Sequence, residues 1–143
     1  MLMNFSDILT SSLRTRGFKI TKNRIAILDF LSNQEDPVSQ DEIKTFVESS
    51  NPKVNKTTIY RELFFLLENG FVKEIEFGDG KKRYEIAINK PHHHHIICRN
   101  CRRVEDVPLD RELEHQEKII EESTKFKLTD HMLEFFGLCL NCQ

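Results

Sequence analysis

Apolar residues recur at helical spacing through the first 70 positions of the chain. Four segments place apolar side chains three or four positions apart, which predicts amphipathic helices: FSDILTSSL, TKNRIAILDFLSN, SQDEIKTFV and KTTIYRELFFLLENG. Thr21 and Asn55 are suitable N-caps for the second and fourth helices, and Ser39 with Glu42 matches a capping box at the third. Gly70 stands where the fourth helix is expected to end.

The apolar pattern changes to a period of two after the fourth helix. FVKEIEF and KKRYEIAI flank the tripeptide GDG, and Tyr84, Ile86 and Ile88 alternate so that they share one face of a strand. Two such segments around a glycine-rich turn predict a β-hairpin. Helices followed by a hairpin are typical of a winged helix-turn-helix, whose fourth helix would enter the major groove of DNA.

The remaining third of the chain predicts a second domain. Strands are expected at HIIC and RVEDV, a helix at LDRELEHQEKIIEES, and two further β segments at KFKLTD and HMLEFFGLC. Asn89-Lys90-Pro91 is a candidate hinge, because proline removes a backbone donor and favours extended chain. The sequence therefore predicts an α+β protein with a winged-helix domain at 1–88, a hinge at 89–91 and a second domain at 92–143.

The net charge of the chain is only −2, but its basic residues are unevenly distributed. A basic run with no acidic residue between Asp7 and Asp29 contains Arg14, Arg16, Lys19, Lys22 and Arg24. Such a run is usually a solvated face, and it supports contact with DNA only because it lies within a predicted DNA-binding fold. No apolar run approaches the ~20 residues of a membrane span, and no signal peptide is visible, so we expect a cytoplasmic protein.

The four cysteines form two matched pairs, Cys98 with Cys101 and Cys139 with Cys142. A C-x₂-C turn directs two thiolates at one ion, and two such turns complete a tetrahedron. In a reducing compartment such pairs are more often metal ligands than disulfides. The spacing therefore predicts a closed structural Zn²⁺ site that ties the end of the second domain to its first strand.

Four consecutive histidines, His92 to His95, precede the first cysteine pair. On a strand, His92 and His94 would point one way and His93 and His95 the other, so the run offers two half-sites. Oxygen donors at Glu85, Asp106 and Glu114, together with His131, could complete them, and such mixed sets suit Zn²⁺, Fe²⁺ or Mn²⁺. Solvated histidines with adventitious metal affinity are the alternative.

The segments GFKITKNRIAIL, TTIYRELFFLLENGFV, HHHHIICRNCRRVEDV and LTDHMLEFFGLCLNC resemble the Fur family of metal-responsive transcription repressors. The resemblance implies a winged-helix DNA-binding domain followed by an α/β dimerisation domain. It implies a structural zinc site at the four cysteines and a regulatory site formed by Glu85, His93, His95 and Asp106. It implies a further site formed by His92, His94, Glu114 and His131, with Glu112 as the alternative to Glu114.

One departure from the family pattern bears on the metal that is sensed. Many iron- and peroxide-sensing members have a histidine just before the third helix, where this chain has Asp36 and Pro37. Asp36 could substitute through oxygen, whereas proline cannot bind a metal. The departure weighs against peroxide sensing by histidine oxidation. Together with the similarity of YRELFFLLENGFV to zinc-uptake regulators, it favours zinc over iron as the regulatory metal.

The expected function is metal-dependent repression by a homodimer that binds an inverted repeat in double-stranded DNA. Predicted DNA contacts are Arg16, Lys19, Arg24, Asn55, Lys56, Thr57, Thr58, Tyr60 and Arg61. A metallohydrolase is disfavoured because no H-E-x-x-H or comparable motif is present, and no small-molecule substrate is expected. A metal store or chaperone remains the alternative class, and it would show no selective affinity for DNA.

Overall fold

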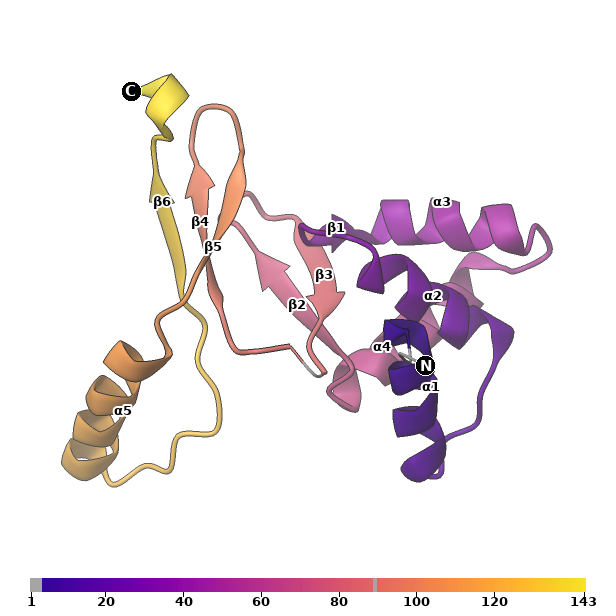
Figure 1. Ribbon diagram of the computed structural model, residues 1–143, viewed down its shortest axis with the longest axis horizontal. Coiled ribbons are helices and arrows are strands. Elements are labelled where there is room, and N and C mark those ends of the chain that lie inside the picture. The colour runs from indigo at the N-terminus through magenta and orange to yellow at the C-terminus, as the bar shows by residue number, and fades with distance from the viewer. Residues whose placement is uncertain (1–3, 89) are drawn as a thin grey trace. The chain divides into compact units, whose positions relative to one another are not determined.

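The computed structural model describes residues 4–88 and 90–143. The chain divides into two compact units, Met1–Lys90 and Pro91–Gln143. Of the predicted hinge at 89–91, Asn89 lies outside the described residues. Helices and small sheets occur in both units, so the predicted α+β class is confirmed (Figure 1).

The first unit has the winged helix-turn-helix order predicted from its sequence, with one additional short strand. Its three-stranded antiparallel sheet has the order β1-β3-β2, and the unpredicted β1 joins when Val38 pairs with Tyr84. The elements are α1 (Phe5–Thr15), α2 (Lys22–Ser32), β1 (Val38–Ser39), α3 (Gln40–Ser50), α4 (Lys56–Glu68), β2 (Val72–Glu76) and β3 (Lys82–Ile86).

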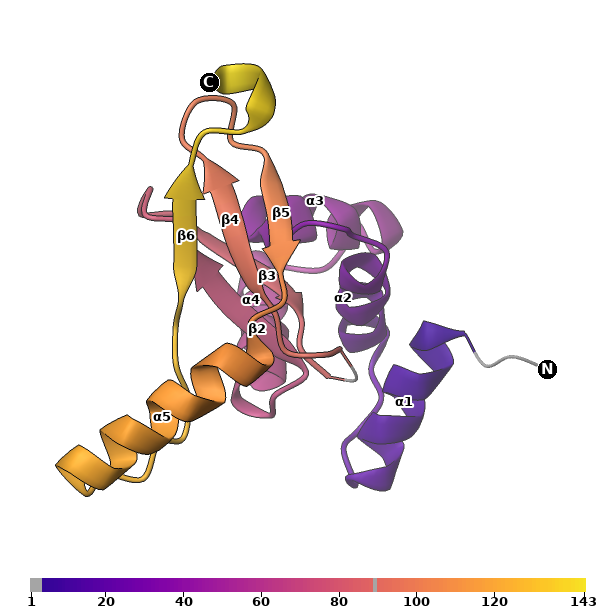
Figure 2. The ribbon, with the colours of Figure 1, turned by 60° about the vertical axis from the view of Figure 1, so that its left-hand side comes forward.

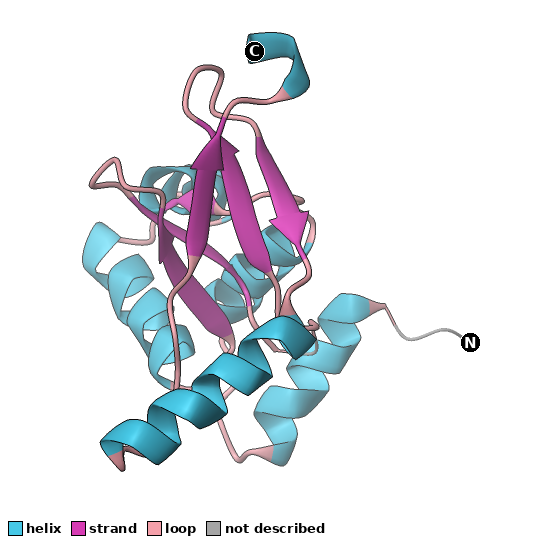
Figure 3. Cartoon of the chain, turned by 90° about the vertical axis from the view of Figure 1, so that its left-hand side faces the viewer, coloured by secondary structure: helices cyan, strands magenta, loops and turns pink. Residues whose placement is uncertain are grey.

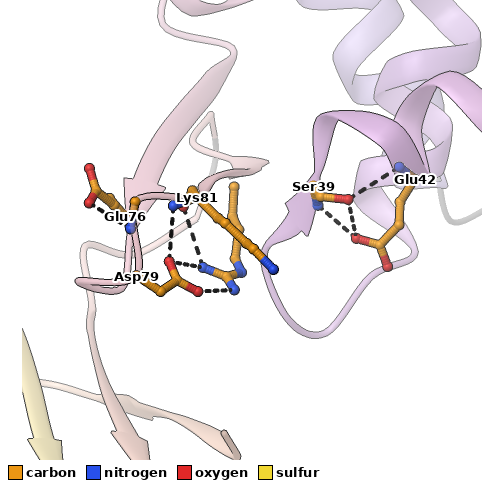
Figure 4. Close-up of polar contacts among 7 residues, drawn as sticks. Ser39, Glu42, Glu76, Asp79 and Lys81 are labelled. Atoms are coloured by element: carbon orange, nitrogen blue, oxygen red, sulfur yellow. Dashed lines mark hydrogen bonds and ion pairs between the residues drawn. The ribbon is translucent and has the colours of Figure 1, made fainter.

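The predicted helix caps are confirmed. The side chain of Asn55 accepts a hydrogen bond from the backbone N–H of Thr58 at 2.8 Å, and Thr21 caps α2 in the same way. Ser39 and Glu42 form a reciprocal capping box, which Figure 4 shows at the start of α3. These contacts satisfy backbone donors that the first turn of a helix leaves unpaired, so they fix where each helix begins.

A single apolar core joins the four helices of the first unit to its sheet. Ile59, Leu63 and Leu66 face inward from α4, and they are almost fully buried. This core orients α4 so that its opposite face, including Arg61 and Phe64, remains exposed. The other buried members are Leu9, Leu13, Ile27, Leu28, Leu31, Val38, Ile43, Val47, Phe71, Val72, Tyr84 and Ile86.

The turn between β2 and β3 is held by its own polar contacts (Figure 4). Gly78 and Gly80 both have a φ of 73°, which glycine adopts without strain. The guanidinium of Arg83 donates to both carboxylate oxygens of Asp79, at 3.1 and 2.7 Å, and the backbone N–H of Lys81 donates to the same carboxylate at 3.1 Å. These donors favour the ionised carboxylate and hold the pKa of Asp79 well below its ordinary value.

Replacing Arg83 with glutamine should raise the pKa of Asp79 toward the ordinary value of about 3.9. Because the folded-state pKa is lowered, this pair stabilises the fold above the ordinary pKa, and the contribution is lost as pH falls through the lowered value. A carboxyl NMR titration of Asp79 would measure the change. Lys82→Gln is the matched control, because Lys82 pairs with Glu74 instead; equal Asp79 midpoints in wild type and Arg83→Gln would contradict the prediction.

The second unit is built around a central strand that carries histidines and a cysteine. Its sheet has the order β5-β4-β6, in which β4 is antiparallel to β5 and parallel to β6. Figure 2 shows the three strands side by side, and Figure 3 distinguishes them from α5 by colour. The elements are β4 (His94–Cys98), β5 (Val104–Val107), α5 (Asp110–Thr124), β6 (Glu134–Gly137) and a 3₁₀ turn (Leu140–Cys142).

The prediction of a strand at KFKLTD is wrong. Lys125 has a φ of 62° and ends α5 in the left-handed region, after which the chain forms an irregular loop. The backbone N–H of Leu128 donates to the carboxylate of Glu121 at 2.7 Å rather than to a neighbouring strand. Phe126 is 76% exposed, so the apolar residues of this segment are not arranged on a buried sheet face.

Few apolar side chains of the second unit are buried. Ile97 and Cys98 are the buried apolar residues there among those described, whereas large apolar side chains remain exposed on the sheet, on α5 and near the C-terminus. The exposed set is Ile96, Ile119, Ile120, Phe126, Met132, Phe136, Leu138 and Leu140. Within the described part of the chain, no helix combines the length and apolar character that crossing a membrane requires.

Candidate metal centres

The four cysteines come together at one end of the second unit. Cys98 ends β4 and Cys101 lies in the following turn. Cys139 precedes the 3₁₀ turn and Cys142 is its last residue. Their sulfur atoms all lie within 4.8 Å of one another, and the Sγ atoms of Cys101 and Cys139 are 3.7 Å apart. A tetrahedral Zn²⁺ with Zn–S bonds of about 2.3 Å needs sulfur separations of about 3.8 Å. The donor set therefore fits one zinc ion.

Backbone amides prepare this cluster for a cation. The N–H of Cys139 donates to Sγ of Cys98 at 3.4 Å, and that contact, with a further one from the backbone of Cys101, lowers the pKa of the Cys98 thiol to about 6. The thiolate is the form that binds metal. The four cysteines are all free thiols, so each Sγ can serve as a ligand.

The four histidines, of which His94 and His95 begin β4 and His92 and His93 precede it, pair by alternate positions, as expected for extended chain. The rings of His93 and His95 lie together on one face, with centroids 4.9 Å apart. The rings of His92 and His94 lie together on the other, with centroids 4.7 Å apart. The predicted pairing of alternate histidines is therefore present in the structure.

His95 lies between acidic side chains from both neighbouring strands. It is opposite Asp106 on β5 and Glu134 on β6, and these register partners share its face of the sheet. Nδ1 of His95 is 3.2 Å from Oε2 of Glu134, and Nε2 is 3.8 Å from Oδ1 of Asp106. Asp106 was predicted as a ligand, whereas Glu134 was missed. Glu85, the remaining predicted member of this set, lies on β3 of the first unit, in register with Lys73.

Three histidines converge on the opposite face. The Nε2 atom of His92 is 3.2 Å from that of His94 and 2.9 Å from that of His131, and the third separation is 3.3 Å. A tetrahedral ion with metal–nitrogen bonds of about 2.0–2.1 Å requires nitrogen separations of about 3.3 Å. The spacing of the three atoms therefore fits the binding of a single transition-metal ion.

The hydrogen bonds of the ring nitrogens strengthen this assignment. Nδ1 of His94 lies 3.1 Å from the carbonyl oxygen of Leu133, and Nδ1 of His131 lies 2.6 Å from a carboxylate oxygen of Glu117. Because both oxygens can only accept, each Nδ1 carries the proton of the neutral ring. The Nε2 atoms of His94 and His131 then present lone pairs to each other at 3.3 Å. An unprotonated nitrogen is the form of imidazole that binds a metal ion.

A surface hollow of about 510 Å³ adjoins these histidines within the second unit. Glu114 and Glu117 line it from α5, and Asp130 and His131 line it from the returning loop. Glu112 is exposed and is not among the lining residues, so of the two predicted carboxylates Glu114 lies at the hollow. Glu114 remains a predicted ligand, and Glu117 was not predicted.

The predicted DNA contacts differ in how much of each side chain is available. Lys19, Lys56, Thr57 and Arg61 are exposed and Tyr60 is half-buried, and the ammonium of Lys56 lies 5.1 Å from the Tyr60 ring. Asn55 and Thr58 form the cap of α4. These positions place an exposed basic and hydroxyl-bearing surface at the start of α4, and its contact with DNA stays a prediction.

Arg16 and Arg24 are engaged in contacts within the first unit. The buried Arg24 donates to Glu62 at 2.7 Å and to the carbonyl of Lys19, and its guanidinium lies 3.7 Å from the Phe65 ring. Arg16 donates to the carbonyl of Asn69 at 2.8 Å. The buried Arg24 would have to give up these partners to reach DNA, whereas the exposed Arg16 uses only one of its five N–H donors in its bond to Asn69.

Comparison with known proteins identifies the family. The sequence model of the ferric uptake regulator family matches residues 15–136. The chain belongs to the ferric uptake regulator family. This confirms the resemblance drawn from its sequence segments.

Proteins similar to this chain are named as different kinds of regulator. The ferric uptake regulation protein of Bacillus subtilis (strain 168) is 36% identical over 142 residues, covering 97% of this chain and 95% of its own. A peroxide-responsive repressor PerR of Staphylococcus saprophyticus is 34% identical over 133 residues, covering 93% of this chain and 88% of its own. Identity at this level shows the family but does not distinguish among its branches.

Solved structures of the ferric uptake regulator family share the fold. The Helicobacter pylori ferric uptake regulator, described as having three functional metal binding sites, matches with a TM-score of 0.72 and 29% identity, over 95% of this chain and 89% of that chain. A zinc uptake regulator complexed with zinc and DNA matches with a TM-score of 0.75 over 98% of this chain and 96% of that chain. Its 24% identity supports the fold alone.

Proposed function

We propose that this chain is a metal-dependent transcriptional repressor that acts as a homodimer on an inverted repeat in double-stranded DNA, with zinc as the metal it senses. The observation that carries the proposal is the convergence of three imidazole Nε2 atoms, within 3.3 Å of one another, in a chain whose other unit is a winged helix. Membership of a family of metal-responsive regulators supports it.

One of the metal sites would be structural, and the others would bind exchangeable metal. A Cys₄ zinc ion supplies a redox-inert tetrahedral cross-link, whereas sites with nitrogen and oxygen donors bind more weakly and exchange with the surrounding metal pool. Cys98, Cys101, Cys139 and Cys142 would hold the structural zinc. Glu85, His93, His95 and Asp106 would form the regulatory site. His92, His94, Glu114 and His131 would form the additional site. The Helicobacter pylori regulator is described as having three functional metal binding sites, the same number as proposed here.

Dimerisation through the second unit would explain its exposed apolar side chains. Phe136 and Ile96 project from the sheet and Leu140 from the C-terminal turn, and a folded unit of 53 residues rarely leaves so many large apolar residues in water. A second copy of the chain would cover them symmetrically. A two-fold dimer would also place two winged helices on two half-sites, which compensates for the weak binding of one module.

DNA contact would centre on α4. Lys56 and Arg61 can contact phosphates or guanine edges, and Thr57 and Tyr60 add hydroxyl groups near the helix N-terminus, where phosphate binds favourably. Lys19 would add a phosphate contact. Arg16, Arg24, Asn55 and Thr58 would support this surface through their contacts within the unit.

Zinc is favoured over iron by the donor composition of the chain. The three-histidine cluster is rich in nitrogen, which suits zinc, although iron and manganese accept similar ligands. Pro37 occupies the region where many iron and peroxide sensors have a histidine, and it cannot bind a metal. Iron sensing is the alternative, and the 36% identity with the Bacillus subtilis ferric uptake regulation protein supports it.

Removing the exchangeable metal while the Cys₄ zinc is retained should weaken DNA binding about 5- to 150-fold, the usual range of allosteric coupling. The probe is a duplex selected by the zinc-loaded protein from a random-sequence pool, and affinity is measured by fluorescence anisotropy at fixed salt. Buffered Zn²⁺ should restore binding. His93→Ala, which removes a ligand of the proposed regulatory site, should reduce the restoration. His115→Ala is the control, because His115 is exposed on α5 outside both histidine sets.

Three other outcomes would count against the proposal in different ways. Unchanged affinity after metal removal would refute metal-dependent binding. Restoration by Fe²⁺ under anaerobic conditions, but not by Zn²⁺, would assign iron as the sensed metal. Failure to select any duplex from the pool would favour a metal store or chaperone over a repressor.

A further inference from the structure

Glu117 contacts a candidate metal ligand although it was not itself a predicted ligand. Its Oε1 atom lies 2.6 Å from Nδ1 of His131, the shortest contact described for any histidine ring of the chain. Both side chains are partly buried, with 28% of His131 and 35% of Glu117 exposed. A hydrogen bond of this length to a carboxylate is charge-assisted and strongly orienting.

The contact determines which nitrogen of His131 can bind a cation. An ionised carboxylate has no proton to donate, so Nδ1 of His131 must carry the proton of the neutral ring. Its Nε2 atom is then left with a lone pair, and this atom lies 2.9 Å from Nε2 of His92 and 3.3 Å from Nε2 of His94. Without Glu117, a ring protonated at Nε2 would direct a hydrogen atom into the space where the ion is expected.

Glu117 also helps to hold in place the segment that carries His131. That segment is an irregular loop, and residues on loops are held less accurately than residues on strands. Glu121, one helical turn beyond Glu117, accepts the backbone N–H of Leu128 at 2.7 Å. The two carboxylates of α5 therefore fasten the returning loop at two points, one of which is the histidine ring itself.

We propose that Glu117 is a positioning residue of the three-histidine metal site: it fixes the tautomer and the orientation of the His131 ring without binding the ion. This inference rests on the proposed function of that site. Its carboxylate contacts Nδ1, which points away from the three converging Nε2 atoms, so Glu117 is placed to support a ligand rather than to be one. Carboxylates that orient metal-binding histidines in this way commonly strengthen metal affinity 10- to 100-fold.

The tautomer of His131 in the metal-free protein provides a readout independent of metal and DNA. Long-range ¹H–¹⁵N correlation spectra at about pH 8, above the ordinary imidazole pKa, distinguish rings protonated at Nδ1 from rings protonated at Nε2. Wild type and Glu117→Gln should show His131 protonated at Nδ1, because the glutamine carbonyl can still accept. Glu117→Ala should show a mixture of the two forms. Glu122→Ala, which removes an exposed carboxylate of the same helix that belongs to no predicted ligand set, should match wild type.

Metal affinity gives the second readout. Zn²⁺ competition with a chromophoric chelator is measured in a His93→Ala background, so that the opposite histidine pair contributes little, and with the Cys₄ zinc retained. Glu117→Ala should weaken binding about 10- to 100-fold, and Glu117→Gln less than about tenfold. Retention of the Nδ1 tautomer and of full affinity in Glu117→Ala would overturn the proposal. Equal losses in both variants, with the tautomer unchanged, would make Glu117 a ligand and would also overturn it.

A failure of the Glu117 proposal can be distinguished from a failure of the proposed repressor function. If wild-type protein binds Zn²⁺ at this site but DNA affinity does not respond to metal, the repressor proposal fails while the role of Glu117 is still measured. If metal-dependent DNA binding is intact and Glu117→Ala matches wild type in both readouts, only the role of Glu117 fails.

Discussion

Replacing Cys139 with serine is expected to release the structural zinc and to unfold the second unit of the chain. The unit buries few apolar side chains, with Ile97 as its one large aliphatic residue that is almost fully buried among those described. Its fold therefore depends on the ion to a degree that a well-packed domain does not. Structural zinc contributes apparent binding free energies of about 10–16 kcal/mol in small domains. This exceeds the free energy of unfolding that such a small apolar core supplies without the ion.

The loss should be confined to the second unit. The first unit has its own core across four helices and a sheet, so its NMR signals should remain dispersed. Zinc content by mass spectrometry should fall by about one equivalent per chain, and sedimentation should show monomers, since the proposed dimer surface belongs to the unfolded unit. Asn141→Ser, an exposed position within the same C-x₂-C turn, is the control. Full zinc content and an unchanged melting curve in Cys139→Ser would show that the cysteines do not hold the fold.

Phe71→Ala is expected to destabilise the first unit by about 3–5 kcal/mol, the usual effect of emptying a buried aromatic site. Phe71 follows Gly70 at the end of α4, and its side chain is fully buried. Its ring lies 6.2 Å from the Phe18 ring and 4.7 Å from the guanidinium of Arg16. The substitution therefore leaves a cavity between the turn that joins α4 to β2 and the segment just after α1 that holds Arg16 and Phe18.

Thermal unfolding followed by circular dichroism would measure the effect, with an expected fall in midpoint of more than about 10 °C. Phe64→Ala is a matched control, because it removes a phenylalanine side chain from a position on α4 that is 60% exposed. Its effect on stability should stay within about 0.5 kcal/mol. Similar losses in the two variants would mean that Phe71 is not the packing element that its burial indicates.

The local features of the fold could be predicted from the sequence because each depends on residues close together in the chain. The caps at Thr21, Ser39 and Asn55 need only a side chain and an amide three positions away. The wing follows from the GDG tripeptide between alternating segments. The two faces of the histidine run follow from the period of a strand.

Features that depend on register between distant segments could not be predicted. Glu134 reaches His95 because β6 lies parallel to β4 with these two residues side by side, and no pattern within either strand specifies that alignment. Glu117 reaches His131 because a loop returns along α5. The KFKLTD segment has apolar residues at alternate positions, yet the left-handed Lys125 and the bond from Leu128 to Glu121 keep it out of the sheet.

The central position of β4 has a consequence for biosynthesis. Its parallel partner β6 and the second cysteine pair lie in the last ten residues of the chain. A ribosome adding about 5–20 residues per second needs roughly 3–10 s to make the 53 residues that follow Lys90. The winged-helix unit can therefore fold on the nascent chain before all the residues that the second unit needs for folding have been synthesised. Cys101 is synthesised 41 positions before Cys142, so the first cysteine pair exists on the nascent chain before the other ligands of the zinc ion have been made.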